Sequence, residues 1–233
     1  MSRFPDICSM YILLAAATTF EIQPTIDFLT QSVAGQERPE TSFLITGIGP
    51  LSTSWSLMRQ VVSRRPDLII QAGIAGSFTP YPAGEVLAVK EDSLADLGVW
   101  EDQRFKTTFD LGLAEPNQPP FTRGQLINPY EQLLGLTGLE QVKAITVNEI
   151  STDPHRIKWY QQNCAPVVES MEGAALHFIC LQEGIPFLQL RSVSNDIGER
   201  DKKKWEIRTA IQQLNSSLIN LLGRLEDQFL HIK

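Results

Sequence analysis

Cysteine and histidine are scarce in this sequence of 233 residues, which contains three of each. The cysteines, Cys8, Cys164 and Cys180, are odd in number and form no CxxC pair, so they fit neither a disulfide framework nor a zinc site. We therefore expect reduced, structural thiols and no bound metal.

Long apolar runs and an excess of positive charge are also missing. The longest apolar run, Met10 to Ala17, is far shorter than the roughly 20 residues that a membrane span requires. The first nine residues include one Arg and one Asp, and no small-residue cleavage site of a signal peptide follows the run. The net charge of -7 gives no electrostatic footprint for a phosphate backbone. We expect a cytoplasmic protein without a membrane or nucleic-acid partner.

The overall composition is that of an ordinary globular protein, with 42% hydrophobic and 20% charged residues. A chain of this length can bury most of its apolar surface in one α/β domain. We expect residues 10–233 to form that domain, and residues 1–9 to precede it as an extension that need not be ordered.

Apolar runs that are typical of buried strands alternate with amphipathic patterns, which predicts a sheet covered by helices. The predicted strands cover residues 11–16, 42–46, 67–72, 84–90 and 186–191, and the predicted helices cover residues 21–31, 51–62, a segment from 171, and 207–229. Asn128-Pro129 and Asp153-Pro154 each place a capping side chain before a proline, which predicts two more helix starts. Residues 102–121 contain three prolines and predict an irregular surface excursion.

Two pairs of glycines follow predicted strands, and we interpret both as turns. Gly47 and Gly49 follow the second strand, and Gly73 and Gly76 follow the third. A tight turn without a ligand and a turn that lets a ligand approach the backbone are equally consistent with this pattern. Neither pair completes the dinucleotide-binding fingerprint, and the sequence contains no P-loop.

Four polar residues lie where open α/β sheets bind ligands. Glu172, at the start of a small-residue helix, is either a partner of the helix dipole or an acceptor for two vicinal ribose hydroxyls. Glu21, soon after the first strand, is either a first-turn helix acid or a base that deprotonates water. Asn195, after the last strand, is either a turn residue or an amide that reads two atoms of a heterocycle. Asp196 belongs to a charged run that is typical of a solvated loop.

Taken in order, five segments resemble the nucleoside phosphorylase and nucleosidase superfamily, which includes the methylthioadenosine/S-adenosylhomocysteine nucleosidases. They are Leu13 to Glu21, Thr46 to Gly49, Gln71 to Gly76, Ser170 to Ala174, and Arg191 to Asn195. Two further stretches, Ala95 to Val99 and Asn195 to Asp201, look like those of futalosine hydrolases, which release hypoxanthine from futalosine in menaquinone synthesis. The resemblance implies a single α/β domain with a central mixed, largely parallel twisted sheet flanked by helices.

The resemblance also implies roles for individual residues. Glu21 would be the general base for the attacking water, and Glu172 would accept hydrogen bonds from the ribose hydroxyls. Met171 would line the sugar pocket. The remaining pocket residues that it implies are Ala75 and Gly76 against the sugar and the water, and Asn148 and Ile150 in the segment that covers the base.

Asn195 departs from the pattern of the methylthioadenosine nucleosidases, which carry an aspartate there. A 6-oxopurine presents two acceptors, O6 and N7, to this side chain; an ionised carboxylate would repel both, whereas an amide NH₂ can donate to them. Asparagine therefore favours hypoxanthine or guanine as the base. Because Asn195 cannot give up a proton, the leaving base would be activated by hydrogen bonding, by solvent, or by an acid such as Asp196.

The resemblance implies an N-glycosidase that needs no cofactor and acts on a small purine nucleoside as a homodimer or higher homo-oligomer. The phosphorylases of the superfamily use arginines in glycine-rich loops to bind phosphate. No Arg or Lys is present in residues 15–19, 47–52 or 73–77, which favours hydrolysis. The alternatives are a nucleosidase or phosphorylase for inosine, guanosine or methylthioadenosine, and a nucleoside-binding protein without activity.

Overall fold

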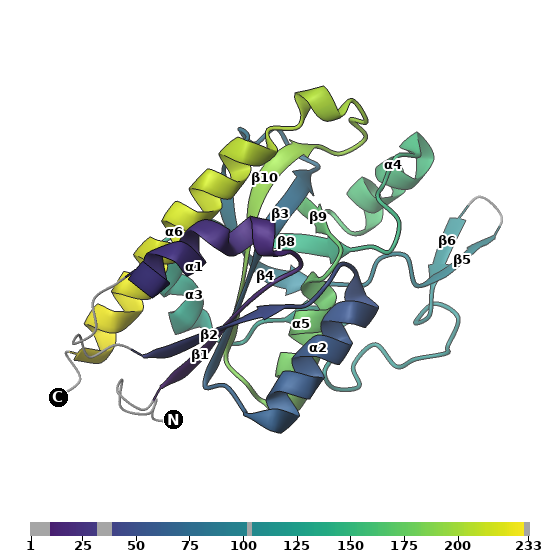
Figure 1. The fold of residues 1–233 in the computed structure, drawn as a ribbon. Coiled ribbons are helices and arrows are strands. Elements are labelled where there is room, and N and C mark those ends of the chain that lie inside the picture. Colours follow the sequence, from purple (N-terminus) through teal and green to yellow (C-terminus); the bar gives the residue numbers. More distant parts are fainter. Residues whose placement is uncertain (1–9, 32–38, 102–103, 231–233) are drawn as a thin grey trace.

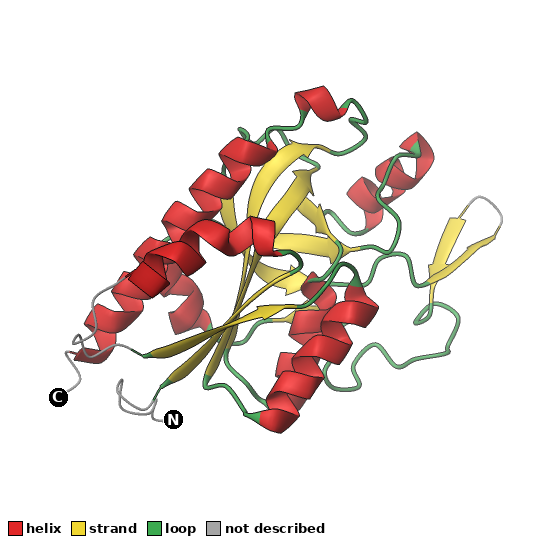
Figure 2. Ribbon diagram, in the orientation of Figure 1, coloured by secondary structure: helices red, strands yellow, loops and turns green. Residues whose placement is uncertain are grey.

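The computed structural model describes residues 10–31, 39–101 and 104–230. The extension expected over residues 1–9 lies outside the described residues. The described chain forms one central sheet with helices on both faces, as Figures 1 and 2 show. This arrangement is the α/β class that the sequence predicts.

The main sheet has eight strands and is mixed, with most neighbouring strands parallel. Its strands are β1 (Tyr11–Ala16), β2 (Glu40–Ile45), β3 (Leu68–Ser77), β4 (Val86–Asp92), β7 (Leu126–Ile127), β8 (Gln141–Thr146), β9 (Val168–Ser170) and β10 (Phe187–Asp196). β3, β10, β4, β8 and β9 pair in a closed ring, and β1 and β2 extend the sheet from β3. A separate hairpin is formed by β5 (Gly98–Glu101) and β6 (Arg104–Thr107), and only β6 falls within the predicted excursion of residues 102–121.

Six α-helices cover the sheet within the described residues. They are α1 (Thr19–Gln31), α2 (Pro50–Ser63), α3 (Glu131–Thr137), α4 (Pro154–Asn163), α5 (Gly173–Glu183) and α6 (Ile207–Leu230). α1 and α6 lie side by side on one face, and α2 and α5 lie together on the other (Figure 1). None of the helices in the described ranges is long and apolar enough to cross a membrane.

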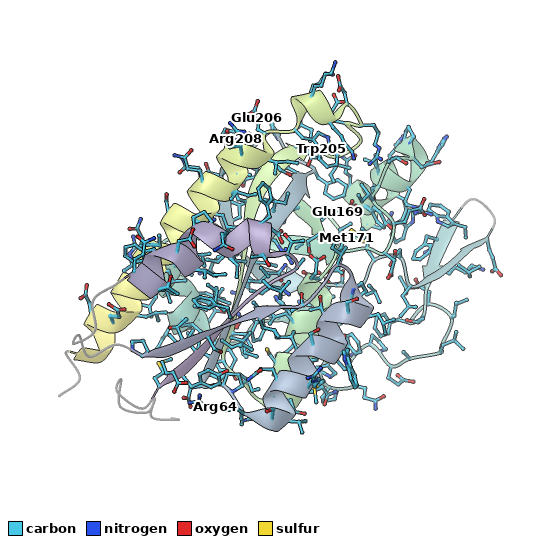
Figure 3. All side chains as sticks on the ribbon, in the orientation of Figure 1. Arg64, Glu169, Met171, Trp205, Glu206 and Arg208 are labelled. Atoms are coloured by element: carbon cyan, nitrogen blue, oxygen red, sulfur yellow. The ribbon has the colours of Figure 1, made fainter. Side chains whose placement is uncertain are left out.

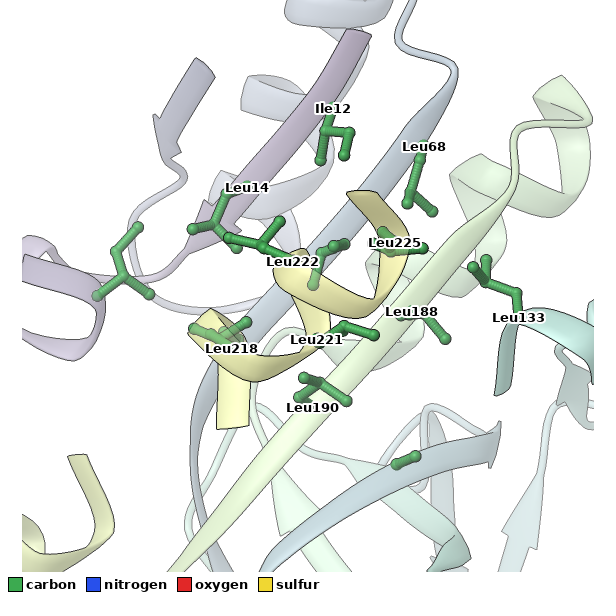
Figure 4. Packing of buried hydrophobic residues seen from close by; sticks show 14 of the residues in the cluster. Ile12, Leu14, Leu68, Leu133, Leu188, Leu190, Leu218, Leu221, Leu222 and Leu225 are labelled. Atoms are coloured by element: carbon green, nitrogen blue, oxygen red, sulfur yellow. The ribbon is translucent and has the colours of Figure 1, made fainter. Parts of the chain in front are cut away.

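Two apolar clusters sandwich the strands, because successive side chains of a strand point to opposite faces. On one face Ile12 and Leu14 of β1 pack with Leu218 and Leu222 of α6 (Figure 4). On the other face Leu13 packs in a cluster with residues of α2 and α5. Burial on both faces explains why β1 and β3 are nearly continuous apolar runs in the sequence.

The predicted turn at Gly73 and Gly76 is wrong, because both glycines lie inside β3. Neither has the positive φ that a glycine turn would require, whereas Gly47 and Gly49 do. The need for glycine at Gly73 comes instead from its neighbours. A Cβ on Gly73 would overlap the guanidinium of Arg191 and lie 2.9 Å from Oε1 of Glu21.

The predicted helix start at Asn128-Pro129 is also wrong, because α3 begins at Glu131 with Tyr130 as its N-cap. The Asn128 side chain is fully buried and links two segments, donating to the carbonyl of Phe187 and accepting from the N–H of Tyr130. The other predicted cap is confirmed. The Asp153 side chain accepts from two N–H groups in the first turn of α4, with proline following it.

Candidate active site

Glu21 lies in the first turns of α1 and is only 7% exposed. Its Oε2 accepts hydrogen bonds from the N–H and the hydroxyl of Thr18, both at 3.0 Å. Its Oε1 accepts from the N–H of Ile74 in β3 at 3.1 Å. These donors hold the carboxylate in place beside β3.

Glu172 lies between β9 and α5 and is buried. Its Oε1 accepts from the N–H of Gly49 at 3.2 Å, and its Oε2 lies 3.4 Å from Nη1 of Arg191. The turn at Gly47 and Gly49 therefore reaches the acid at the start of α5. The sequence predicts both features, but it does not predict their contact.

Arg191 is the central residue that the sequence analysis does not single out. It lies on β10, is 1% exposed, and donates from Nη2 to Oε1 of Gln71 at 2.9 Å. The missed signal was an arginine within an apolar strand, because a buried charge must be paired. Its guanidinium pairs with Glu172 and lies against Gly73, as the Glu21 carboxylate does, so Arg191 is close to both predicted acids.

Asn195 lies within β10 rather than in a turn, opposite Gly76 of β3. Its Oδ1 accepts from the Ser194 hydroxyl at 2.8 Å, and its Nδ2 donates to the Asp196 carbonyl at 3.0 Å. Nδ2 also lies 3.4 Å from the position that a Cβ on Gly76 would occupy. Asp196 is exposed at the end of the strand, and its backbone carbonyl contacts Asn195.

Ala75, Gly76 and Met171 lie near these groups. Ala75 is buried, and its carbonyl oxygen lies 3.2 Å from the hydroxyl oxygen of Ser194. Gly76 pairs with Glu169 of β9 as well as with Asn195. Met171 is half-buried, lies next to Glu169 in Figure 3, and immediately precedes Glu172. The ends of β3, β9 and β10 therefore bring the predicted sugar-pocket residues together.

Asn148 and Ile150 lie in the exposed loop after β8, whose end pairs with β9. The N–H and the side chain of Asn148 donate to the Asp96 carboxylate at 2.6 and 3.1 Å. Two residues after Asn148, Ile150 is exposed, and Ser151 then donates from its N–H and hydroxyl to the buried Glu169 carboxylate. Burial raises the pKa of Glu169. Two carboxylates thus hold this loop at both ends.

A cavity of about 820 Å³ lies at the start of α5, and neither Glu21 nor Glu172 lines it. It is lined by Pro50 and Ser54 of α2, by Ala174 and Phe178 of α5, and by much of the segment from 93 to 126. Large apolar side chains nearby are exposed, among them Leu51, Trp55, Leu97, Leu113 and Phe178. The wall of this cavity is therefore apolar and open to a covering surface.

The chain is similar to a family of nucleoside-processing enzymes in sequence and in fold. The model of the phosphorylase superfamily matches residues 24–225. A futalosine hydrolase of Streptomyces coelicolor is 29% identical over 189 residues, which are 78% of this chain and 79% of the relative. A 5'-methylthioadenosine/S-adenosylhomocysteine nucleosidase of a Shewanella species is 26% identical over 202 residues, which are 82% of each chain.

Solved structures share the fold at lower sequence identity. The structure of futalosine hydrolase of Helicobacter pylori has a TM-score of 0.77 and 15% identity, covering 92% of this chain and 97% of that one. A 5'-methylthioadenosine/S-adenosylhomocysteine nucleosidase of Colwellia psychrerythraea in complex with adenine has a TM-score of 0.78 and 19% identity, covering 95% and 98%.

Proposed function

Because the chain belongs to the phosphorylase superfamily, we propose that it is an N-glycosidase that hydrolyses futalosine to hypoxanthine and dehypoxanthine futalosine. The observation that carries the proposal is the pair of buried acids, Glu21 and Glu172, around the guanidinium of Arg191. Relatives described as futalosine hydrolases at 28 to 29% identity support the same substrate. Residues 10–233 would act as one domain.

In this proposal Glu21 orients and deprotonates the attacking water. As the bond between C1' and N9 lengthens, positive charge develops on the ribosyl ring and electrons flow into the purine. The carboxylates of Glu21 and Glu172 lie in a buried setting, where negative charge stabilises such a cation more than it would in water. General-base assistance of this kind is worth about 10²- to 10⁴-fold in rate.

Glu172 and its neighbours hold the sugar. The two oxygens of the Glu172 carboxylate accept hydrogen bonds from the ribose hydroxyls, a geometry that suits a bidentate acceptor. Met171 gives the sugar an apolar contact, and Ala75 and Gly76 lie against the sugar and the water. The loop with Asn148 and Ile150 covers the purine.

Water, rather than phosphate, is the nucleophile in this proposal. The glycine-rich segments contain no Arg or Lys. The structure nevertheless places one cation beside them, because the guanidinium of Arg191 on β10 lies against Gly73. Its guanidinium pairs with Glu172 and lies near Glu21, so two carboxylates are close to one cation. A phosphate dianion would meet net repulsion there, whereas a neutral water would not.

Asn195 reads the base. With Oδ1 accepting from Ser194 and one N–H of Nδ2 donating to the Asp196 carbonyl, the second N–H remains to donate to a purine acceptor. A 6-oxopurine offers two such acceptors, O6 and N7. Because the Asp196 side chain is exposed, we favour hydrogen bonding by Asn195 over acid catalysis by Asp196 as the activation of the leaving group.

We also propose a homodimer or higher homo-oligomer in which a second copy covers the apolar cavity. Leu51 and Trp55 of α2 are 85% and 68% exposed, next to the cavity residues Pro50 and Ser54. Exposed apolar patches of this kind are typical of protein–protein contacts. A cytoplasmic location and a place in menaquinone synthesis complete the proposal.

An endpoint assay tests the proposed reaction. The purified protein is incubated with futalosine, inosine or methylthioadenosine, each with and without phosphate, and the released base and sugar are identified by chromatography. Release of hypoxanthine from futalosine without phosphate is the expected result. Release that requires phosphate would make the protein a phosphorylase, and adenine release would contradict the role of Asn195. Release of no base from any of the three would favour a nucleoside-binding protein without activity.

A further inference from the structure

α5 begins without the usual cap. Glu172 occupies the N-cap position, yet among the described residues its carboxylate caps no N–H group of α5. The carboxylate instead contacts Gly49 and Arg191, on the side of the proposed sugar pocket. The first N–H groups of a helix have no partner within it, and an N-cap side chain normally accepts from one of them.

Thr146, the last residue of β8, supplies the missing acceptor. Its buried Oγ1 accepts from the N–H of Ala174, the second residue of α5, at 2.8 Å. A hydroxyl that accepts from an N–H group still has its own proton to donate. Thr146 donates that proton to Oδ1 of Asp92, the last residue of β4, at 2.9 Å.

Asp92 lies directly beneath the first turn of α5. It is fully buried, and its Oδ1 also accepts from the N–H of Ser93 at 2.7 Å. A Cβ on Gly173 would overlap Oδ2 of Asp92 and the side-chain amide of Gln189, so only glycine lets the helix start this close. A carboxylate in this position is favoured by the positive end of the helix dipole.

We propose that Asp92 and Thr146 are positioning residues that cap α5 in place of Glu172 and so leave the Glu172 carboxylate free to bind ribose. This inference rests on the proposed function, in which Glu172 accepts from the ribose hydroxyls. A carboxylate that capped its own helix would use an oxygen on the N–H of Ala174. It would then turn away from Gly49 and from the sugar.

The substitution Thr146→Val tests the inference, because valine has nearly the shape of threonine but lacks the hydroxyl. The N–H of Ala174 then loses its acceptor, and Glu172 is the adjacent side chain that can replace it. We expect kcat/KM for futalosine to fall about tenfold relative to that for 2'-deoxyfutalosine, as for the loss of one hydrogen bond to a charged group. Thr146→Ser, which keeps the hydroxyl, should keep the wild-type ratio of kcat/KM for futalosine to that for 2'-deoxyfutalosine.

Thr137→Val is the matched control. Thr137 is buried like Thr146, but its hydroxyl donates to the carbonyl of Leu134 within α3, at 2.7 Å. This variant should lose stability without changing the preference for ribose. In a Glu172→Gln background, Thr146→Val should have no further effect on the preference, because its effect passes through Glu172. Retention of the preference in Thr146→Val, with loss of it in Glu172→Gln, would overturn the inference.

A crystal structure of the Thr146→Val protein separates this inference from the proposed function. A Glu172 carboxylate turned toward the N–H of Ala174 supports the capping exchange, even if the wild-type protein releases no hypoxanthine and the proposed function fails. A Glu172 carboxylate that still contacts Gly49 and Arg191 contradicts the exchange, whatever the substrate is.

Discussion

At the scale of single residues, the carboxylate of Glu21 is held by three donors, two from Thr18 between β1 and α1 and one from Ile74 in β3. In the proposed mechanism, this preorganisation holds Glu21 where it takes a proton from the attacking water. We expect Glu21→Gln to lower kcat by about 10²- to 10⁴-fold, because the amide cannot accept the proton of the water. The dissociation constant of hypoxanthine, measured by calorimetry, should change little.

Glu85→Gln makes the same chemical change at an exposed position and should leave kcat unaltered. A Glu21→Gln enzyme with near-normal kcat would remove Glu21 from the mechanism.

Asn195 determines the base that is cleaved if its amide donates to the purine. We expect Asn195→Asp to shift preference from 6-oxopurine toward 6-aminopurine nucleosides, because a carboxylate repels O6 and N7 but accepts from a 6-amino group. The measurement is the ratio of kcat/KM for futalosine to that for its 6-amino analogue. An unchanged ratio would show that another group reads the base.

Two buried titratable residues, Asp92 and His177, have opposite pH linkage. Burial raises the pKa of Asp92 from 3.8 to about 6 and lowers the pKa of His177 from 6.5 to about 4. Asp92 binds its proton more tightly in the folded state, so its contribution to stability falls as pH rises from about 4 to 6. His177 binds its proton more tightly in the unfolded state, so its contribution rises as pH rises from about 4 to 6.5.

The two effects nearly cancel in the wild type, and single substitutions should expose them. In Asp92→Asn the effect of His177 is no longer offset by that of Asp92, and the free energy of unfolding should rise by up to about 3 kcal/mol between pH 4 and 6.5. In His177→Gln it should fall by a similar amount between pH 4 and 6. Urea unfolding at several pH values measures both slopes, and slopes of the same sign would contradict the assignment.

The site residues that the sequence predicted were those whose chemistry differs from their surroundings, such as an acid before a small-residue helix. Glu21 and Glu172 both prove to be buried and held by backbone N–H groups. Their proposed roles stay predictions. Arg191 was missed because its partners, Gln71 and Glu172, are distant in sequence, and only the folded sheet brings them together.

At the scale of elements, β3 connects the proposed base to the proposed sugar site, and its Gly73 makes room for both charged groups. We expect Gly73→Ala to cost about 1–3 kcal/mol of folding free energy, because the added methyl presses on Arg191 and Glu21. Activity should fall with it, since the guanidinium must move. Thermal unfolding and the futalosine assay measure the two effects.

Gly223→Ala in α6 is the matched control, because a Cβ there has no neighbour within 4 Å. A glycine inside a helix weakens it, so this variant should gain about 0.5–1 kcal/mol. Equal changes in stability and activity in the two variants would mean that Arg191 and Glu21 leave room for a methyl group at Gly73.

The pattern of apolar residues predicted a helix that buries one face and a strand that is buried on both faces. The heptad-like apolar spacing of the last helix predicted α6, and the apolar run at residues 11–16 predicted β1 with its exact bounds. The end of β3 was mistaken for a turn because glycine has two uses, positive φ and close approach, and sequence does not distinguish them. The cap at Asn128 failed because its side chain bonds β10 across 59 residues.

At the scale of the whole molecule, the apolar face around the cavity predicts self-association. We expect Trp55→Glu to shift the protein to a smaller assembly in size-exclusion chromatography with light scattering, because a charge would be buried in the contact. Val62→Glu, near the C-terminal end of α2 and also exposed in the single chain, should keep the wild-type mass. A monomeric wild type would contradict the proposed oligomer.

The closed ring of strands also fixes when the protein can become active during its own synthesis. β10 is the last strand to leave the ribosome, yet it fills the position between β3 and β4 and contains both Arg191 and Asn195. Until it arrives, β3 and β4 each expose an unpaired edge, which is a risk for aggregation. A nascent chain therefore carries Glu21 and Glu172 for some time before Arg191 and Asn195 of the proposed site are in place.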